Sequence, residues 1–315
     1  MKKLLIRLFT LLMAVSIVFQ AKAGQTETKA LGGSVDMGNV IQMGTFEGTS
    51  HYVVFYPKAL ESSDQTWPVA VWANGTMCAP ALYTSLLAGV AEQGYVVVAS
   101  SDVMSADGKS QREAIDWIFD QSMDEESVFC GKIDPQRIGA FGHSQGGRSS
   151  VNAAAADSRI SCIVSIAGSS YGSEAEKLST PALFLTGSKD LVVLSSLWVK
   201  PAYNKCKGPA VYASLDGGIH TSVILNADPY IHYVTQWFNA WLNNDSDSMS
   251  VFKGNGLRQD KAWKDYQAKN LNASGVGSVF SGGSFWKFAS IAELVVIVLL
   301  VVLFRKGGKN DRMAV

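Results

Sequence analysis

The residues from Gly142 to Gly146 form a candidate nucleophile motif. They read Gly-His-Ser-Gln-Gly, which fits the pattern G-x-S-x-G with Ser144 at its centre. An apolar segment, RIGAFG, precedes the motif, and a small-residue segment, GGRSSVNAAAA, follows it. A strand, a tight turn and a helix in this order expose a serine hydroxyl above a sheet, because glycine permits the strained turn and the close helix. A plain tight turn without chemistry is the alternative, so the partners of Ser144 decide between the two.

A serine nucleophile needs a base to take its proton, and histidine is the usual base. The chain has four histidines. His51 lies in an early predicted strand, His143 lies inside the turn without easy reach back to Ser144, and His232 lies in the last predicted helix. His220 lies in the glycine-rich segment SLDGGIHTS, just after the last predicted strand. We therefore predict His220 as the base; a solvated loop histidine is the alternative.

The base in turn needs a carboxylate that fixes its orientation. The segment PALFLTGSKD predicts a strand and a turn that end at Asp190, between Ser144 and His220 in the chain. The order Ser, Asp, His is the one found where a G-x-S-x-G serine follows a parallel strand. A helix-capping or turn role is the alternative for Asp190.

Cleavage of an acyl bond also needs hydrogen-bond donors for the developing oxyanion. The backbone N–H of Gln145, directly after the nucleophile, is the first candidate. The loop WANGTMCAPALY follows an early buried strand and supplies the second candidate, the N–H of Thr76, with Met77 as the fallback. The predicted chemistry needs no cofactor and no metal.

The elements that must position these residues alternate between strand and helix from about residue 50 to 244. This order predicts a mainly parallel sheet with helices on both faces, and its functional residues belong at the carboxyl ends of the strands. Besides RIGAFGHS, the apolar runs predict strands at residues 51–57, 68–75, 95–100, 161–168, 181–188 and 209–215. Helical spacing covers residues 81–94, 109–121 and 226–244.

These segments together resemble the α/β-hydrolase fold, closest to its chlorophyllase, dienelactone-hydrolase-like and polyester-hydrolase (cutinase-like) branch. The resemblance rests on NGT followed by P and Y, GYVVVASSD, GKIDPQRIGAFGHSQGG, LTGSKD and GGIH. Dienelactone hydrolases use a cysteine nucleophile, whereas this chain has Ser144. Polyester hydrolases often carry a tryptophan after the next strand; here the segment AGSSYG offers Tyr171 as the aromatic platform. The short connection from SIAG to TPALFL leaves no room for a lid insertion, so we expect an open site.

Both ends of the chain carry targeting features. A basic start, an apolar run and a small-x-small site predict a signal peptide cleaved after Ala23, with an uncleaved anchor as the alternative. The run FASIAELVVIVLLVVLF with basic residues behind it predicts a transmembrane helix with a cytoplasmic tail, with a buried helix as the alternative. The predicted parts are 1–23 signal peptide, 24–45 polar leader, 46–244 catalytic domain, 245–287 flexible stalk, 288–304 transmembrane helix and 305–315 tail.

The segment SGVGSVFSGGS before the apolar run resembles, together with that run and the basic tail, bacterial GlyGly C-terminal sorting signals. The resemblance implies a rhomboid-type protease as a processing partner. We expect an exported protein, periplasmic or at the cell surface, that is tethered to the membrane or released after processing. In that oxidising setting the four cysteines are expected to form disulfides, and three connectivities are possible for Cys78, Cys130, Cys162 and Cys206.

The charge balance excludes a nucleic-acid binder, because 27 basic residues face 27 acidic ones without a basic footprint. The expected function is the hydrolysis of small-molecule or polymeric carboxylic esters through Ser144, His220 and Asp190. Two alternatives stay open: a peptidase or acyltransferase that uses the same three residues, and a non-catalytic surface binding protein of the same fold.

Overall fold

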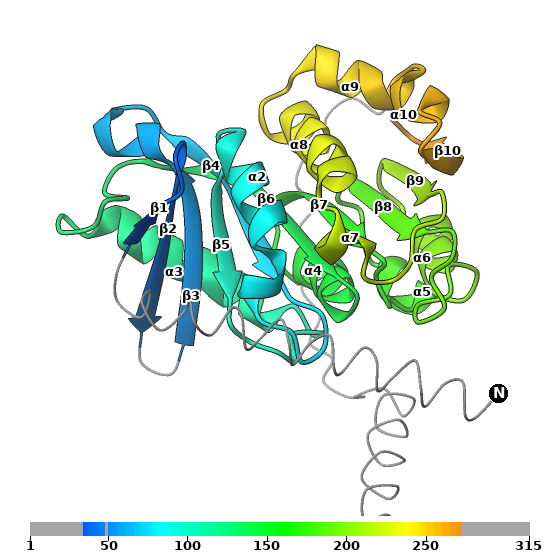
Figure 1. Cartoon of the computed structure of the whole chain (residues 1–315), viewed down its shortest axis with the longest axis horizontal. Coiled ribbons are helices and arrows are strands. Elements are labelled where there is room, and N and C mark those ends of the chain that lie inside the picture. Colours follow the sequence, from blue (N-terminus) through cyan, green and yellow to red (C-terminus); the bar gives the residue numbers. More distant parts are fainter. Residues whose placement is uncertain (1–33, 48–49, 272–315) are drawn as a thin grey trace, which may run out of the picture. The chain divides into compact units, whose positions relative to one another are not determined.

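The computed structural model describes residues 34–47 and 50–271. Its strands form one ten-stranded sheet in the order β1-β2-β3-β5-β4-β6-β7-β8-β9-β10 (Figure 1). The six strands from β5 to β9 in this order run parallel, whereas β1, β2 and β3 at one edge and β10 at the other pair antiparallel. The strands are β1 (Ser34–Asp36), β2 (Val40–Glu47), β3 (Ser50–Pro57), β4 (Trp67–Ala73), β5 (Val96–Ser100), β6 (Ile133–His143), β7 (Ile160–Ile166), β8 (Ala182–Gly187), β9 (Ala210–Leu215) and β10 (Trp263–Lys269).

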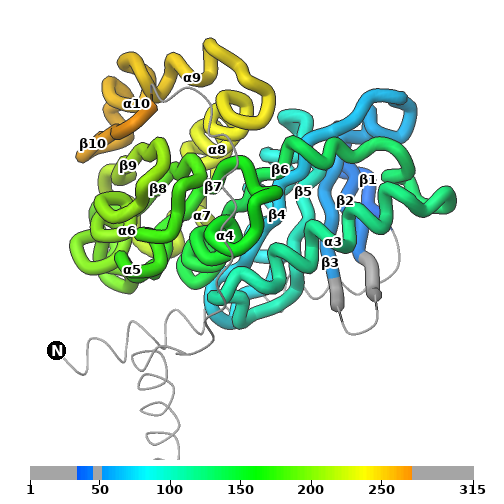
Figure 2. The backbone as a smooth tube through the Cα atoms, turned by 180° about the vertical axis from the view of Figure 1, so that it is seen from behind, coloured from blue at the N-terminus to red at the C-terminus, as the bar shows by residue number. Residues whose placement is uncertain are grey.

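Helices cover both faces of this sheet and close two hydrophobic cores. Figure 1 shows α2 and α8 on the near face, and Figure 2, from behind, shows α3 and α4 on the other. The first face carries α2 (Thr84–Glu92), α7 (Ser222–Leu225), α8 (Asp228–Leu242), α9 (Ser246–Lys253) and α10 (Gly256–Gln259). The second face carries α3 (Lys109–Met123), α4 (Gln145–Ala156), α5 (Gly172–Ala175) and α6 (Val199–Lys205). Two 3-10 turns, η1 (Lys58–Ser62) and η2 (Pro80–Tyr83), complete the described elements.

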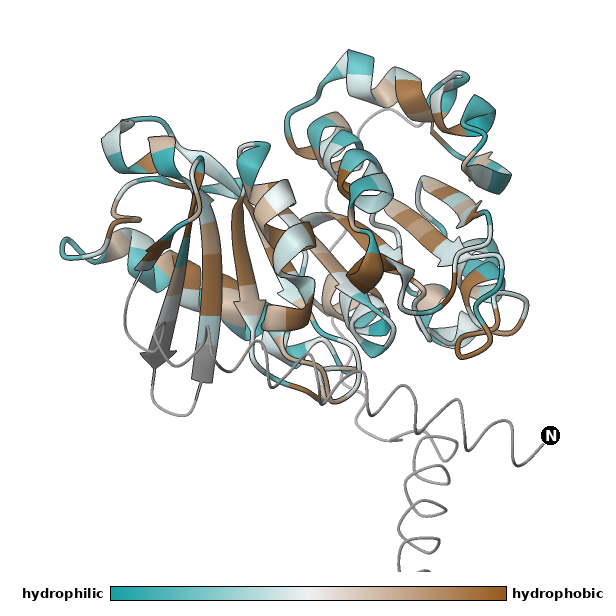
Figure 3. Ribbon diagram, viewed as in Figure 1, coloured by the Kyte–Doolittle hydropathy of each residue, from teal (hydrophilic) through white to brown (hydrophobic). Residues whose placement is uncertain are grey.

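The strands β4, β5 and β8 at the centre of the sheet consist mostly of apolar residues because helices cover them on both sides. Every residue of β4, β5 and β8 is buried. In Figure 3 these strands are largely brown, while the outward turns of the helices are teal. The predicted mainly parallel sheet with helices on both faces is therefore confirmed.

Both edges of the domain differ from the sequence-based boundaries. β1 lies inside the expected polar leader and β2 begins in it, because β2 pairs along its length with β3. In the expected stalk, Asp245 caps α9 by accepting the Asp247 and Ser248 N–H groups, and β10 pairs with β9. Three buried side chains, spaced several residues apart in the sequence, hold this region to the domain: Phe252, Leu257 and Trp263.

The expected disulfides are absent, since all four cysteines are free in the structure. The fold gives the physical reason for one pair: Cys162 is buried in the core on the α8 face, whereas Cys206 is buried in the core on the opposite face. The predicted signal peptide and transmembrane helix lie outside the described residues. Within 34–47 and 50–271, no helix has the length and apolar character needed to cross a membrane.

Candidate active site

Four of the predicted site residues lie in connections at the carboxyl edge of the parallel strands. Ser144 directly follows β6, and Asp190 lies three residues after β8 ends. His220 lies in the connection that follows β9, and Thr76 in the one that follows β4. Parallel strands end at the same edge, so residues far apart in the chain are brought to one place.

Ser144 occupies a strained turn between β6 and α4. Its backbone has φ 58° and ψ −118°, a conformation that a residue with a side chain rarely adopts and that neighbouring structure must enforce. The two flanking glycines permit the close packing that holds this turn. A Cβ on Gly146 would lie 1.9 Å from the Ala73 carbonyl oxygen, and a Cβ on Gly142 would lie 2.3 Å from the Gly146 carbonyl oxygen. The Ser144 N–H donates to the Ile166 carbonyl at 2.9 Å, which ties the turn to β7.

The structure brings Ser144, His220 and Asp190 into one hydrogen-bonded chain. His220 Nε2 lies 3.0 Å from Ser144 Oγ, and His220 Nδ1 lies 2.8 Å from Asp190 Oδ2. Both distances are normal for hydrogen bonds. The carboxylate can only accept, so His220 Nδ1 carries the proton and Nε2 is free to accept the serine proton. This arrangement can raise the nucleophilicity of a serine hydroxyl.

The Asp190 carboxylate is buried and held in one orientation by the backbone. Its Oδ1 accepts from the N–H groups of Val192 and Val193, both at 2.9 Å. These bonds leave Oδ2 for His220 alone. The side chain of Asp190 is fully buried and that of His220 is 10% exposed, so water competes little for their hydrogen bond.

The loop after β4 contains Thr76, the other residue predicted to supply an oxyanion donor. A Cβ built on Gly75 would lie 3.6 Å from the Ser144 Cβ, so this loop passes directly beside the nucleophile. A turn closes it with a 3.0 Å bond from the Cys78 N–H to the Gly75 carbonyl. The Met77 N–H already donates to the Val103 carbonyl at 3.0 Å, so the fallback donor is occupied. The role of the Thr76 N–H as an oxyanion donor stays a prediction. Gln145 begins α4, where helix N–H groups have no acceptor within the helix.

Asn74 fixes the start of the same loop. It is fully buried, accepts from the Trp72 indole N–H at 2.8 Å, and donates to the Ser100 carbonyl at 2.7 Å. A rigid loop of this kind can present an N–H group without reorganisation during a reaction.

Tyr171 is embedded in a cluster with charged and aromatic neighbours. Its ring lies 4.7 Å from the Arg148 guanidinium carbon and 5.0 Å from the Trp198 ring centre. Glu174 holds both partners, because its carboxylate accepts from Arg148 at 2.7 Å and from the Tyr171 N–H at 2.9 Å. The role of Tyr171 as a substrate platform stays a prediction.

The Arg148–Glu174 pair gives a stability prediction. We expect Glu174→Ala to lower the free energy of unfolding by about 3 kcal/mol, because it leaves a buried guanidinium without its carboxylate. The Arg148 side chain is 8% exposed. The matched control is Asp116→Ala, whose ion pair with Arg159 is largely exposed and should cost less than about 1 kcal/mol. Urea denaturation measures both; equal losses in the two variants would contradict the prediction.

Two residues near the site were not predicted to contribute to it. His143 was expected to lack easy reach back to Ser144; its Nε2 instead contacts the backbone carbonyl of His220 at 2.9 Å. Its other ring nitrogen lies 3.0 Å from the hydroxyl of Tyr83, which comes from η2. His51 lies in β3 and His232 in α8, as the sequence indicated, and the structure shows that His232 is exposed.

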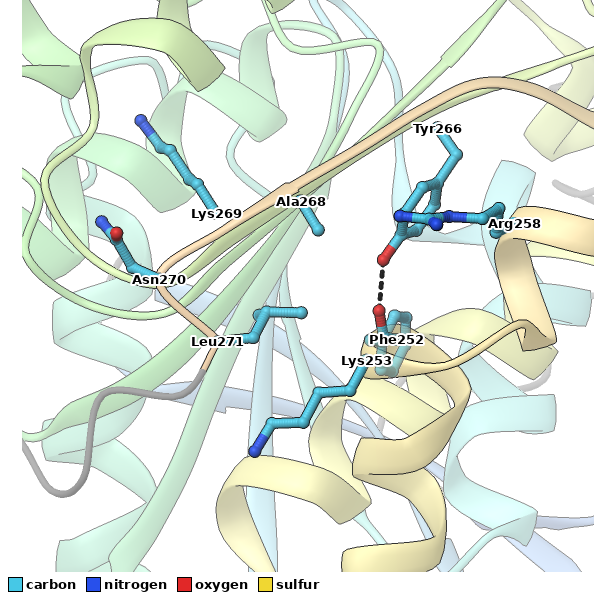
Figure 4. Close-up of a pocket in the computed structure, with 8 residues that line it drawn as sticks. All are labelled: Phe252, Lys253, Arg258, Tyr266, Ala268, Lys269, Asn270 and Leu271. Atoms are coloured by element: carbon cyan, nitrogen blue, oxygen red, sulfur yellow. Dashed lines mark hydrogen bonds between the residues drawn. The ribbon is translucent and has the colours of Figure 1, made fainter.

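A separate hollow of about 210 Å³ lies between α9, α10 and β10 (Figure 4). The Tyr266 hydroxyl donates to the Phe252 carbonyl there, and the Arg258 guanidinium lies 5.1 Å from the Tyr266 ring centre. None of its lining residues belongs to the hydrogen-bonded chain of Ser144. No cluster of three or more His, Cys, Asp or Glu residues suited to a metal occurs in the described part of the chain.

The sheet order, the strained serine turn and the Ser–His–Asp chain define the class of protein, an α/β-hydrolase. A more specific assignment follows from comparison with known families. The family described as PET hydrolase-like matches residues 25–270, which is most of the chain. The chain belongs to this family, in agreement with the resemblance noted from its motifs.

Individual relatives are distant. The chain is 23% identical over 164 residues to cutinase est2 of Thermobifida alba, covering 50% of this chain and 54% of the relative. It is 24% identical over 200 residues to a bis(hydroxyethyl) terephthalate hydrolase of Streptomyces coelicolor, covering 61% and 62%. It is 25% identical over 167 residues to lipase 1 of a Moraxella species, covering 50% of each. The chain thus spans between half and two thirds of the length of these relatives.

Proposed function

We propose that this protein is a serine hydrolase that cleaves carboxylic esters through an acyl-enzyme. The observation that carries the proposal is the hydrogen-bonded chain from Asp190 through His220 to Ser144, with the serine on a strained turn. The named activities of the three relatives, a cutinase, a terephthalate ester hydrolase and a lipase, support the same bond type.

The reaction begins when Ser144 Oγ attacks the ester carbonyl carbon. His220 Nε2 takes the serine proton, and Asp190 stabilises the imidazolium that forms. The tetrahedral intermediate collapses, the alcohol leaves with the proton returned by His220, and Ser144 carries the acyl group. A water molecule then repeats the sequence: His220 takes its proton, and the acid is released from Ser144.

The developing oxyanion is held by the N–H groups of Gln145 and Thr76 in this proposal. Gln145 offers the N-terminal end of α4, where the helix dipole also favours negative charge. Thr76 follows Gly75, which passes beside Ser144. Both donors belong to backbone that is fixed before the substrate binds, which is the arrangement that stabilises a transition state most.

The substrate side of the site is apolar and open. Exposed large apolar side chains lie on the segments that follow β4, β5, β8 and β9 at the carboxyl edge of the sheet: Met77, Met104, Leu191, Val192, Leu194, Leu197, Ile219 and Leu225. We call these residues the apolar rim. Between β7 and β8 the described chain holds α5, a single helical turn, which supports the expectation of a site without a lid. We therefore propose esters with apolar acyl groups, including polymer chains at a surface, as substrates.

The proposed setting is outside the cytoplasm. The predicted signal peptide and the C-terminal apolar run with its GlyGly-type segment support an exported enzyme, tethered to the membrane or released by a rhomboid-type protease. An insoluble polymer cannot enter a cell, so an enzyme for such a substrate has to act there.

The proposal is tested by labelling and turnover together. A fluorophosphonate probe should attach to Ser144, located by peptide mass spectrometry, and p-nitrophenyl esters of increasing acyl length should be hydrolysed. A labelled Ser144 with cleavage of amides and not esters would favour a peptidase. Transfer of the acyl group to an added alcohol in preference to water would favour an acyltransferase. An intact fold without labelling or turnover would favour the binding protein.

The apolar rim gives a prediction on insoluble substrate. We expect the double variant Leu191→Ser, Leu197→Ser to release product from a polycaprolactone film about 10-fold more slowly, because two exposed leucines no longer bury area on the film. These side chains are 73% and 63% exposed. Turnover of soluble p-nitrophenyl butyrate should change little.

The control is Met123→Ser, which removes a side chain 72% exposed at the far end of α3. If this control slows film hydrolysis as much as the rim variant, general surface hydrophobicity and not the rim determines adsorption.

A further inference from the structure

A buried tyrosine and histidine connect the two sides of the proposed active site. The Gly75 N–H lies 3.2 Å from the Tyr83 hydroxyl, and this hydroxyl lies 3.0 Å from His143 Nδ1. His143 Nε2 lies 2.9 Å from the backbone carbonyl oxygen of His220. The connection therefore runs from the loop beside the nucleophile to the backbone of the proposed base.

The direction of each hydrogen bond follows from the chemistry of the partners. A carbonyl oxygen only accepts, so His143 Nε2 carries a proton and donates it to His220. In a neutral imidazole the other nitrogen then accepts, so the Tyr83 hydroxyl donates to His143 Nδ1. The Gly75 N–H can only donate, and the Tyr83 oxygen receives it. One tautomer of His143 satisfies all three bonds.

The surroundings keep both groups neutral. Burial, and then the neighbouring His220, lower the pKa of His143 well below its ordinary value. Burial raises the pKa of Tyr83 well above its ordinary value, so the hydroxyl keeps its proton. Neutrality matters because the ring centres of His143 and His220 are 4.7 Å apart, and His220 becomes a cation during the proposed reaction.

The two side chains are also fixed by packing. Tyr83 is 1% exposed and His143 3%. The Tyr83 ring lies 4.8 Å from the ring of Trp72, whose indole N–H holds Asn74 at the start of the loop. Tyr83 and His143 therefore have little conformational freedom, and they restrain the loop that begins at Asn74.

We infer that Tyr83 and His143 are positioning residues that hold the His220 backbone and the Gly75–Thr76 loop at a fixed separation across Ser144. The inference rests on the proposed function, because positioning matters only if His220 is the base and Thr76 an oxyanion donor. A displacement of about 1 Å in such a site can lower turnover about 100-fold, so a fixed separation has a large effect on rate.

The experiment compares variants that keep or remove one donor. His143→Leu removes the donor to the His220 carbonyl, while His143→Gln keeps an N–H at a similar reach. Tyr83→Phe removes only the hydroxyl. Tyr95→Phe is the control, because Tyr95 is fully buried and donates to Asn239 at 2.6 Å. Thermal unfolding of each variant identifies any that fail to fold.

We expect His143→Leu to lower kcat for p-nitrophenyl butyrate about 10- to 100-fold with little change in KM, and Tyr83→Phe to lower it about 10-fold. His143→Gln should recover most of the loss, and Tyr95→Phe should keep the original kcat. Equal kcat in the Leu and Gln variants, or equal kcat in Tyr83→Phe and Tyr95→Phe, would overturn the inference.

A second readout does not depend on turnover. In proton NMR, the imidazole N–H of His220 that faces Asp190, assigned by its loss in His220→Ala, should shift or broaden in His143→Leu and Tyr83→Phe. It should stay in place in His143→Gln and Tyr95→Phe. An unchanged resonance in both His143→Leu and Tyr83→Phe would overturn the inference. Absence of ester turnover in the unmodified protein would instead contradict the proposed function, while the NMR comparison still decides the positioning.

Discussion

Replacing Ser144 with alanine should lower kcat for p-nitrophenyl butyrate by roughly five to six orders of magnitude, because the acyl-enzyme can no longer form. The remaining rate should still exceed that of water, since the N–H groups of Thr76 and Gln145 continue to stabilise the oxyanion. The fold should be preserved, because the substitution removes one hydroxyl, which lies 3.0 Å from His220 Nε2, and keeps the backbone of the turn. Steady-state kinetics and circular dichroism together measure both expectations.

The control for this variant is Ser122→Ala, which removes a hydroxyl that donates to the Phe119 carbonyl at the end of α3. It should leave kcat unchanged. If Ser144→Ala retains more than about a hundredth of the original kcat, the main nucleophile is another group and the proposed mechanism fails.

The centre of the fold could be predicted because the burial of each central strand is evident from that strand's own residues. β4, β5 and β8 are buried on both faces, so they appear as short continuous apolar runs. The positions of Ser144, Asp190 and His220 followed from the same runs, because each residue comes soon after a strand. The sequence could not supply the distances between them, which depend on the twist and packing of the whole sheet.

The edges of the domain could not be predicted because their stabilising contacts are few and distant in sequence. In β10, Trp263 is the only buried residue, and the other residues are half-buried or exposed. Its pairing with β9 joins residues about fifty positions apart, for example Trp263 with Leu215. Polar composition with little periodicity therefore indicated a stalk, although long-range pairing forms a strand.

The Tyr83–His143 connection was missed for a related reason. Its contacts join residues separated by 60 and 77 positions. In the sequence, His143 appeared unsuited to a role because its side chain cannot easily reach back to its neighbour Ser144. The structure shows that its ring points towards the His220 backbone, a partner that no local pattern could indicate.

The second large effect on activity is expected for Asp190→Asn, which replaces one carboxylate oxygen with an amide nitrogen. In Asp190→Asn, the N–H groups of Val192 and Val193 require an acceptor, so the amide oxygen should take the place of Oδ1. The amide nitrogen, a donor, then faces His220 Nδ1. His220 must accept there, which places its proton on Nε2, where it cannot receive the proton of Ser144.

We therefore expect Asp190→Asn to lower kcat about 10,000-fold with little change in the fold, because the base is held in the wrong tautomer. Asp260→Asn is the matched control: its carboxylate also accepts from the backbone and from a side chain, namely from the Ala262 N–H and the Tyr233 hydroxyl. It should keep the original kcat, since neither partner faces Ser144. A similar kcat for Asp190→Asn and the unmodified protein would show that His220 does not depend on this carboxylate, and the triad would then have to be reassigned around another acid.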